Sequence, residues 1–176
     1  NIALDNISKN LTARSAQAFF NSFVTSLSKN LNVPFVFVGN YNALKSEIST
    51  ASFWAKDKII DYNYILEGTP CNDVIKNEKE LCSIKGVQKN YPKDRDLVEL
   101  NIEGYYGSPL FNTNGEVFGH IAIMDEKPLK NLNLLKSIVK IYSTRIGAEL
   151  ERYKNELALK RSEAKYRSIS DNNLLG

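Results

Sequence analysis

The sequence predicts an α+β domain in which a β-sheet is combined with an early helix and a very long final helix. Three observations carry this prediction: an amphipathic helical stripe near the start, two β-rich runs joined by an Asn-Gly turn, and about forty residues of helical periodicity at the end. Between them lie short apolar runs and short capped segments, which are typical of strands and of connecting helices.

The first predicted element is a helix within the segment LTARSAQAFFNSFVTSLSKNLNV. Its apolar residues recur every three or four positions and share one side: Ala16, Phe19, Phe20, Phe23, Val24, Leu27 and Leu31. Asn10 or Thr12 is expected to cap its start, and Pro34 prevents the helix from continuing beyond Val33. Such a helix buries its apolar side against another layer.

Two strands are expected next. The stretch PFVFVGNY is short, apolar and rich in Phe and Val, which is typical of a central strand covered on both faces. The stretch TASFWAKDKII is predicted to be its hairpin partner. Because side chains alternate along a strand, Phe53 and Trp54 are expected on opposite faces.

Short elements are predicted in the middle of the chain. The segment EGTPCNDVIKN indicates a helix with Thr69 at the N-cap, Pro70 at the first helical position and Asp73 at the favourable end of the helix dipole. The segment ELCSI indicates a short strand. The segment NYPKDRDLVELNI indicates a loop followed by a short helix capped by Asp94 or Asp96.

The clearest local signal is a β-hairpin across NTNG, because Asn114–Gly115 supplies the positive φ that tight turns require. Alternation along its second strand separates Phe118, His120, Ala122 and Met124 from Val117, Gly119, Ile121 and Ile123. The β-branched side is expected to meet the helices. The only histidine of the chain, His120, is therefore expected on the opposite face.

From Leu129 onward the pattern is helical for about forty residues. Apolar residues step by three or four along one side: Leu135, Ile138, Tyr142, Ile146, Leu150, Tyr153 and Leu157. A mean helix has about 11–12 residues, so a helix this long is expected to extend past a small domain. The overhanging part cannot bury its stripe within one small domain, so we expect it to pair with a second copy as a parallel coiled coil that weakens at Lys160 and Arg161.

The composition is that of an ordinary globular domain and excludes several classes of protein. The 176 residues are 43% hydrophobic and 24% charged, with a net charge of +3 at pH 7. No basic patch indicates nucleic-acid binding, no apolar run approaches the roughly 18 residues of a membrane helix, and the first residues do not have the layout of a signal peptide. Cys71 and Cys82 are expected to be reduced thiols, so the predicted location is cytoplasmic. The absence of an initial Met indicates a segment of a longer protein.

The hairpin and two upstream segments resemble one known family. Gly107–Leu110, the turn at Asn114–Gly115 and the residues Val117, Gly119, Ile121 and Ile123 resemble the hairpin of GAF domains. The segments LEGTPCNDV and YPKDRDLVELNIEGYYG resemble GAF domains found beside PAS domains in bacterial sensor proteins. The resemblance implies an antiparallel sheet of five or six strands with the first and last helices on one face. It also implies that loops and short helices cover the other face, where members of the family bind small ligands.

A second resemblance lies at the end of the chain, where RSEAKYRSISDNN is similar to the start of a PAS domain. The implied boundaries are an N-terminal flank at 1–10, a GAF domain at 11–150, a helical coiled-coil linker at 151–168 and the beginning of a PAS domain at 169–176. The implied parent is a modular bacterial signalling protein, with a histidine kinase or a diguanylate cyclase as its output.

Six residues are candidates for the ligand face that the resemblance implies: Trp54, Tyr64, Cys71, Tyr91, Tyr106 and His120. Tyr and Trp combine an apolar body with a polar tip, which suits a small-molecule cavity and equally suits an ordinary core whose hydroxyls reach the surface. A helix N-terminus lowers the pKa of a thiol, so Cys71 is either a reactive sensor residue or a small packed side chain.

The residues argue against catalysis and against the family's known cofactors. Bilin-binding members place a histidine beside the attaching cysteine, whereas Asn72 follows Cys71, and the family's cyclic-nucleotide signature is absent. One histidine and two cysteines a dozen positions apart do not make a metal site, and no nucleophile motif accompanies Cys71.

The sequence therefore predicts a cytoplasmic sensory domain that is not itself an enzyme and has no identified cofactor. It is expected to form a homodimer through its last helix and to signal to the PAS and output domains of the same chain. It is not expected to bind nucleic acid, and this segment is not expected to insert into a membrane. Two alternatives remain open: a ligand-free dimerisation module and a thiol-dependent reductase that uses Cys71.

Overall fold

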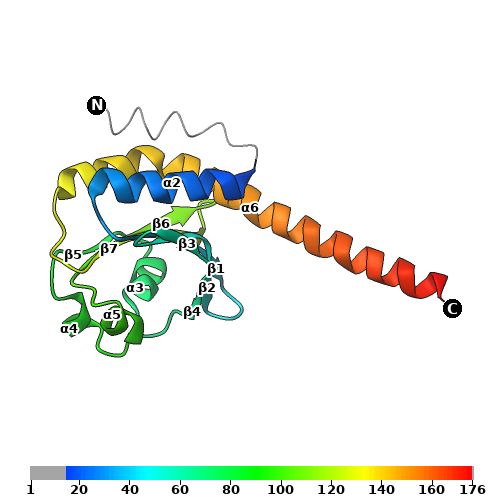
Figure 1. Ribbon diagram of the computed structural model, residues 1–176, viewed down its shortest axis with the longest axis horizontal. Helices are drawn as coiled ribbons and strands as arrows, with labels where there is room; N and C mark the ends of the chain where they lie inside the picture. The colour runs from blue at the N-terminus through cyan, green and yellow to red at the C-terminus, as the bar shows by residue number, and fades with distance from the viewer. Residues whose placement is uncertain (1–14, 176) are drawn as a thin grey trace.

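An antiparallel sheet separates two layers of helices in the computed structural model, which describes residues 15–175. The elements are α2 (Ala16–Leu31), β1 (Phe35–Asn42), β2 (Glu47–Ala55), β3 (Lys58–Ile60), β4 (Asn63–Ile65), α3 (Pro70–Asn77), β5 (Leu81–Ser83), α4 (Val87–Asn90), α5 (Arg95–Glu99), β6 (Gly104–Phe111), β7 (Val117–Asp125) and α6 (Leu132–Leu174). Helices α2 and α6 cover one face, and α3, α4 and α5 lie over the other (Figure 1).

The strand order is β3-β2-β1-β7-β6-β5, and β4 also pairs with β2. This arrangement confirms the predicted fold class. The sheet has seven strands, whereas five or six were expected. Two short strands of three residues each, β3 and β4, pair with different parts of β2. The stretch predicted as one hairpin partner is thus divided at Lys56, whose φ of 61° turns the chain. The short elements α4 and β4 were not predicted.

Helix α2 buries its predicted apolar side completely, since all seven residues of that stripe are buried. Ser15 caps the helix, and its side-chain oxygen accepts a hydrogen bond from the backbone N–H of Ala18. The predicted caps Asn10 and Thr12 lie outside the described residues. Asn32, in the left-handed region with a φ of 53°, ends the helix two residues before Pro34.

Strand β1 is central, between β2 and β7, as predicted. On β2 the predicted alternation is confirmed. Phe53 packs against Phe37 on the face covered by the short helices, whereas Trp54 packs with the core beneath α2, where the Lys29 ammonium lies 5.8 Å from its ring. The sheet therefore separates two cores, one on each face.

The β6–β7 hairpin is confirmed, with Gly115 at a φ of +80° in its turn. A bulge follows the turn: Leu110 pairs with Gly119 and Phe111 with Val117, so Phe118 is the extra residue. The predicted alternation is therefore right from Gly119 to Met124 and wrong before it. Phe118 packs in the core beneath the long helices and Val117 packs against the other core.

Helix α6 is 43 residues long and has two parts with different surroundings. The stripe of the first part is buried inside the domain, at Leu135, Ile138, Tyr142, Ile146 and Leu150. Helix α2 and the sheet cover these residues, in agreement with the implied packing of the first and last helices on one face. Residues 158–174 are all exposed, and this second part projects away from the sheet (Figure 1).

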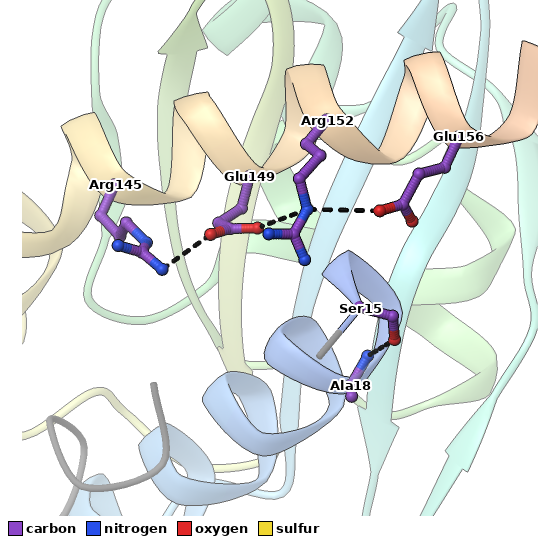
Figure 2. A network of polar contacts seen from close by, with 6 residues as sticks. All are labelled: Ser15, Ala18, Arg145, Glu149, Arg152 and Glu156. Carbon is purple, nitrogen blue, oxygen red and sulfur yellow. Dashed lines mark hydrogen bonds and ion pairs between the residues drawn. The ribbon is translucent and has the colours of Figure 1, made fainter. Parts of the chain in front are cut away.

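A row of charged side chains runs along α6 where the two parts meet (Figure 2). The Glu149 carboxylate is almost fully buried and pairs with Arg145 at 2.8 Å and with Arg152 at 3.4 Å. Arg152 also pairs with Glu156 at 3.3 Å. The Arg145 guanidinium lies 5.6 Å from the Phe19 ring, so the row also joins α6 to α2.

Candidate functional site

A small cavity lies between the sheet and the short helices, on the face away from α2 and α6. Its volume is about 40 Å³, which is room for about one or two water molecules. Strands, helix α3 and the α5 region all contribute to its lining: Phe37, Thr50, Phe53, Tyr62, Tyr64, Pro70, Cys71, Asp94, Asp96, Leu97, Leu100, Ile102, Tyr105 and Met124. The lining is largely apolar with a few converging polar groups, which is the general character of small-molecule sites.

Cys71 reaches the cavity from the second position of α3. Thr69 caps this helix by accepting a hydrogen bond from the backbone N–H of Asn72, and Pro70 occupies the first helical position, as predicted. The Cys71 thiol is buried and lies 3.2 Å from the Tyr105 hydroxyl. Burial raises the pKa of Cys71 to about 12 despite the helix terminus and these hydrogen bonds. The thiol is therefore protonated at neutral pH.

His120 lies at the same face, fully buried beneath the cavity wall. Its Nε2 is 3.2 Å from the Tyr64 hydroxyl, and its ring packs edge-on against Phe37. The Tyr64 hydroxyl also forms a hydrogen bond with the Cys71 side chain. Four side chains thus contact one another in order, from His120 through Tyr64 and Cys71 to Tyr105. We call these four residues the buried polar chain.

The buried polar chain is neutral throughout. Desolvation lowers the pKa of His120 to about 3 and raises the pKa values of Tyr64 and Tyr105 well above their usual range. Each of the three contacts has one hydrogen between its two heavy atoms when Tyr105 donates to Cys71, Cys71 to Tyr64 and Tyr64 to Nε2 of His120. The Nδ1 atom of His120 then carries the remaining proton, and it has no hydrogen-bond partner among the described residues.

Two aspartates at the edge of the cavity serve local structure. The Asp94 carboxylate caps α5 by accepting from the backbone N–H groups of Asp96 and Leu97, as predicted for one of the two candidate caps. Burial first, and then the hydrogen bond with Asp96, raise the pKa of Tyr62 to about 12. These contacts hold the α5 region against the sheet.

The predicted candidates divide between the two faces. Tyr64 and Cys71 line the cavity, and His120 is joined to it through Tyr64. Tyr91 packs against the same core, and its hydroxyl donates to Asp73 at 2.6 Å, which ties α4 to α3. Burial and this carboxylate raise the pKa of Tyr91.

Trp54 and Tyr106 were placed wrongly, because both lie on the face covered by α2 and α6. Each follows a residue that does face the cavity, Phe53 and Tyr105, and successive strand residues point to opposite faces. The Tyr106 hydroxyl donates to Glu80 at 2.9 Å, and Glu80 pairs with Lys136 of α6 at 2.7 Å. Leu97 and Phe37 line the cavity but were not among the predicted candidates. Phe37 pairs with Phe53 in the β1–β2 ladder and so faces the same side of the sheet, and this pairing was the signal available for Phe37.

This arrangement suits binding better than catalysis. Cys71 is protonated and enclosed, and its partners are neutral hydroxyls rather than a base. Cys82 is exposed on β5, opposite Tyr106 and therefore on the other face of the sheet from Cys71. Within residues 15–175 no three His, Cys, Asp or Glu side chains cluster as metal ligands. In the same range no helix is long and apolar enough to span a bilayer.

Comparison with known proteins rests on structure alone, since no protein-family profile and no curated protein sequence matches the chain. The GAF domain of a Coxiella burnetii phosphoenolpyruvate-protein phosphotransferase matches with a TM-score of 0.70 at 13% identity, over 89% of this chain and 95% of that chain. The GAF domain of the Acinetobacter phosphoenolpyruvate-protein phosphotransferase matches with a TM-score of 0.68 at 10% identity, over 86% and 94% of the two chains.

An enzyme has a similar structure. The free methionine-R-sulfoxide reductase of Neisseria meningitidis, in complex with its substrate, matches with a TM-score of 0.70 at 11% identity, over 88% of this chain and 89% of that chain. At such identities the likeness concerns the fold and not the activity. The sheet order, the two helical layers and these matches together establish that this chain has the GAF fold.

Proposed function

We propose that the chain is the regulatory GAF domain of a cytoplasmic bacterial signalling protein, which binds a small molecule at the cavity and passes the change to α6. The observation that carries this proposal is the division of α6. Its first part forms a wall of the core, and its second part, residues 158–174, lies outside the domain. A helix built in this way connects the domain mechanically with whatever follows it.

The cavity supports a compact and mostly apolar ligand with at least one hydrogen-bonding group. Its wall is apolar except for Thr50, Asp94, Asp96 and the groups of Tyr62, Tyr64, Tyr105 and Cys71. A volume of about 40 Å³ is smaller than the roughly 300 Å³ at the lower end of ligand pockets. A ligand of that size therefore needs the cavity wall to open, and the wall segment that we expect to move is the α5 region, whose helix has only five residues.

Two paths through the sheet connect the cavity with α6. On β6, Tyr105 contacts Cys71 at the cavity while its neighbour Tyr106 reaches Lys136 through Glu80. On β7, His120 belongs to the buried polar chain while its neighbour Gly119 lies directly against Leu150. A movement of either strand at the cavity therefore displaces residues that contact α6 on the other face.

The remaining parts of the proposal concern the rest of the protein. The second part of α6 pairs with the same helix of a second copy and leads into a PAS domain. The similarity of residues 161–173 to the start of a PAS domain supports that continuation. The output is a histidine kinase or a diguanylate cyclase. The GAF domain itself is not an enzyme, a view that the enclosed and protonated thiol of Cys71 supports.

The test uses an artificial ligand in an enlarged cavity. Leu97→Ala removes a buried side chain from the cavity wall and enlarges the cavity, and an apolar cavity of about 150 Å³ binds benzene. Benzene is expected to raise the melting temperature of Leu97→Ala and to change the amide hydrogen exchange of residues 151–174. Wild-type protein with benzene is the matched control and should show neither effect.

The same experiment separates the proposal from the alternative of a ligand-free dimerisation module. If benzene stabilises Leu97→Ala while exchange along α6 stays unchanged, cavity occupancy does not reach α6 and the regulatory proposal fails. The melting temperature reports occupancy independently of exchange. An unchanged α6 therefore cannot be attributed to an empty cavity.

A further inference from the structure

Four aromatic side chains contact one another in a closed ring, and all four line the cavity: Phe37, Phe53, Tyr62 and Tyr64. We call these four residues the aromatic wall. Around the ring, the distances between neighbouring centroids are 5.2 Å, 6.2 Å, 6.0 Å and 6.1 Å. The faces of aromatic rings carry partial negative charge, and they attract a cation that lies within about 6 Å of a centroid.

Two carboxylates, those of Asp94 and Asp96, line the same cavity and are only partly exposed. Oδ1 of Asp94 accepts both backbone hydrogen bonds at the start of α5, so Oδ2 has no hydrogen-bond partner among residues 15–175. Asp96 accepts a hydrogen bond from the Tyr62 hydroxyl. In the same range no Lys or Arg pairs with either carboxylate. Lys93 and Arg95 are exposed and do not line the cavity.

The negative charge of Asp94 extends across the cavity. Beside burial, which is the larger cause, this charge helps to raise the pKa of four other lining residues: Tyr62, Tyr64, Cys71 and Tyr105. Burial above all, and also the charge of Asp96, raise the pKa of Asp94 itself. A partly buried carboxylate beside a second one is unfavourable without a cation, and a positively charged ligand would supply that cation.

The rest of the lining disfavours an anionic or zwitterionic ligand. None of the described residues that line the cavity is Lys, Arg or His, so a carboxylate or phosphate on the ligand would face Asp94 and Asp96 without a partner. Apolar side chains complete the wall and suit an apolar body, among them Leu100, Ile102 and Met124.

We propose that the cavity binds a compact organic ammonium ion with an apolar body, held by the aromatic wall and by the charges of Asp94 and Asp96. The inference rests on the proposed function and names the chemical class of its ligand. The ammonium group is the hydrogen-bonding group of that ligand, and its charge is shared between ring faces and carboxylates.

The test compares three probes of similar size in the Leu97→Ala chain, in which the cavity is enlarged. Choline carries a quaternary ammonium group. The second probe is the uncharged alcohol in which a carbon atom replaces the nitrogen of choline, and the third, glycine betaine, carries a carboxylate beside the same ammonium group. Isothermal titration calorimetry should give choline a dissociation constant at least tenfold lower than that of either other probe.

Two variants of the Leu97→Ala chain separate the contributions of charge and cap. Asp94→Asn removes the charge but keeps the cap of α5, because Asn caps helices as well as Asp does. It should weaken choline binding at least fivefold and leave binding of the uncharged alcohol unchanged. Asp57→Asn is the matched control, since it removes an exposed carboxylate outside the cavity, and it should change neither affinity.

A third variant tests the aromatic wall. Phe53→Leu replaces an aromatic ring with an apolar side chain, so it should weaken choline binding at least threefold and change binding of the uncharged alcohol less. An alcohol that binds as tightly as choline, or an Asp94→Asn effect no larger than that of Asp57→Asn, overturns the inference. Either result leaves the proposed function standing, because benzene tests that function separately.

The remaining outcomes also decide the question. If benzene stabilises Leu97→Ala and choline does not bind it, the cavity accepts a ligand but not an ammonium ion, and the inference is wrong. If neither compound binds, the cavity does not open to ligands, and both the inference and the proposed function fail.

Discussion

Replacing Gly119 with alanine should lower the free energy of unfolding by about 3 kcal/mol, because the added Cβ has no space. The Cβ atom would lie 2.4 Å from the backbone oxygen of Gly39 and 2.4 Å from a methyl carbon of Leu150. The Leu150 side chain can rotate away, whereas the Gly39 oxygen belongs to the neighbouring central strand β1. Relief therefore requires β7 to separate from β1 or α6 to lift from the sheet.

The expected decrease in melting temperature is roughly 6–12 °C, measured at a fixed protein concentration. Gly115→Ala is the matched control, because Gly115 has nothing within 4 Å but has a φ of +80°. Its cost is the backbone strain alone, about 1 kcal/mol. If Gly119→Ala were no more destabilising than Gly115→Ala, the close approach of β7 to the backbone oxygen of Gly39 on β1 would be wrong.

Lowering the pH from 8 to 5 should destabilise the fold by about 2 kcal/mol through His120 alone. The folded imidazole has a pKa of about 3 because it is fully buried, whereas the usual value is 6.5. Between these two values the unfolded chain binds a proton that the folded chain does not bind. Stability therefore falls as the pH drops below 6.5, and the loss continues until the pH approaches 3.

Chemical unfolding at pH 8, 6.5 and 5 measures this effect, and His120→Phe is the comparison that isolates it. The chain has one histidine, so the variant lacks the only side chain with a usual pKa near 6.5. Between pH 8 and pH 5 the free energy of unfolding of the variant should fall by about 2 kcal/mol less than that of the wild type, whatever its stability at pH 8. Equal slopes for wild type and His120→Phe would show that His120 is not held neutral in the core.

Local chemistry made much of the fold predictable. The Thr69 cap, the Asp94 cap and the Asn114–Gly115 turn each depend on a few adjacent residues, and all three occur as the sequence indicates. The bulge at Phe118 could not be predicted, because an extra residue in a strand leaves no pattern in the composition of the sequence. Its effect was to exchange the faces of Val117 and Phe118.

The site was predicted less completely than the fold, for a physical reason. Aromatic character was used to choose Trp54 and Tyr106, although alternation allows only one residue of each neighbouring pair to face the cavity. Tyr105 and Tyr106 are chemically identical, so only the position of the sheet between its two helical layers decides which one meets Cys71. Likewise, the contact of His120 with Tyr64 joins residues 56 positions apart.

The stripe of α6 shows a related limit. Periodicity identified a long amphipathic helix correctly, but it could not reveal that α2 and the sheet bury the stripe as far as Leu150. A stripe that is already covered is not available to a second copy.

The central claim is that the cavity and the α6 dimer are coupled, and the dimer dissociation constant tests it most directly. Sedimentation equilibrium of Leu97→Ala should give a dissociation constant that benzene changes at least fivefold, since a coupling of about 1 kcal/mol or more is typical of linked sites. By the same linkage, benzene should bind monomer and dimer with affinities that differ accordingly. Identical dissociation constants with the cavity filled and empty would contradict the account.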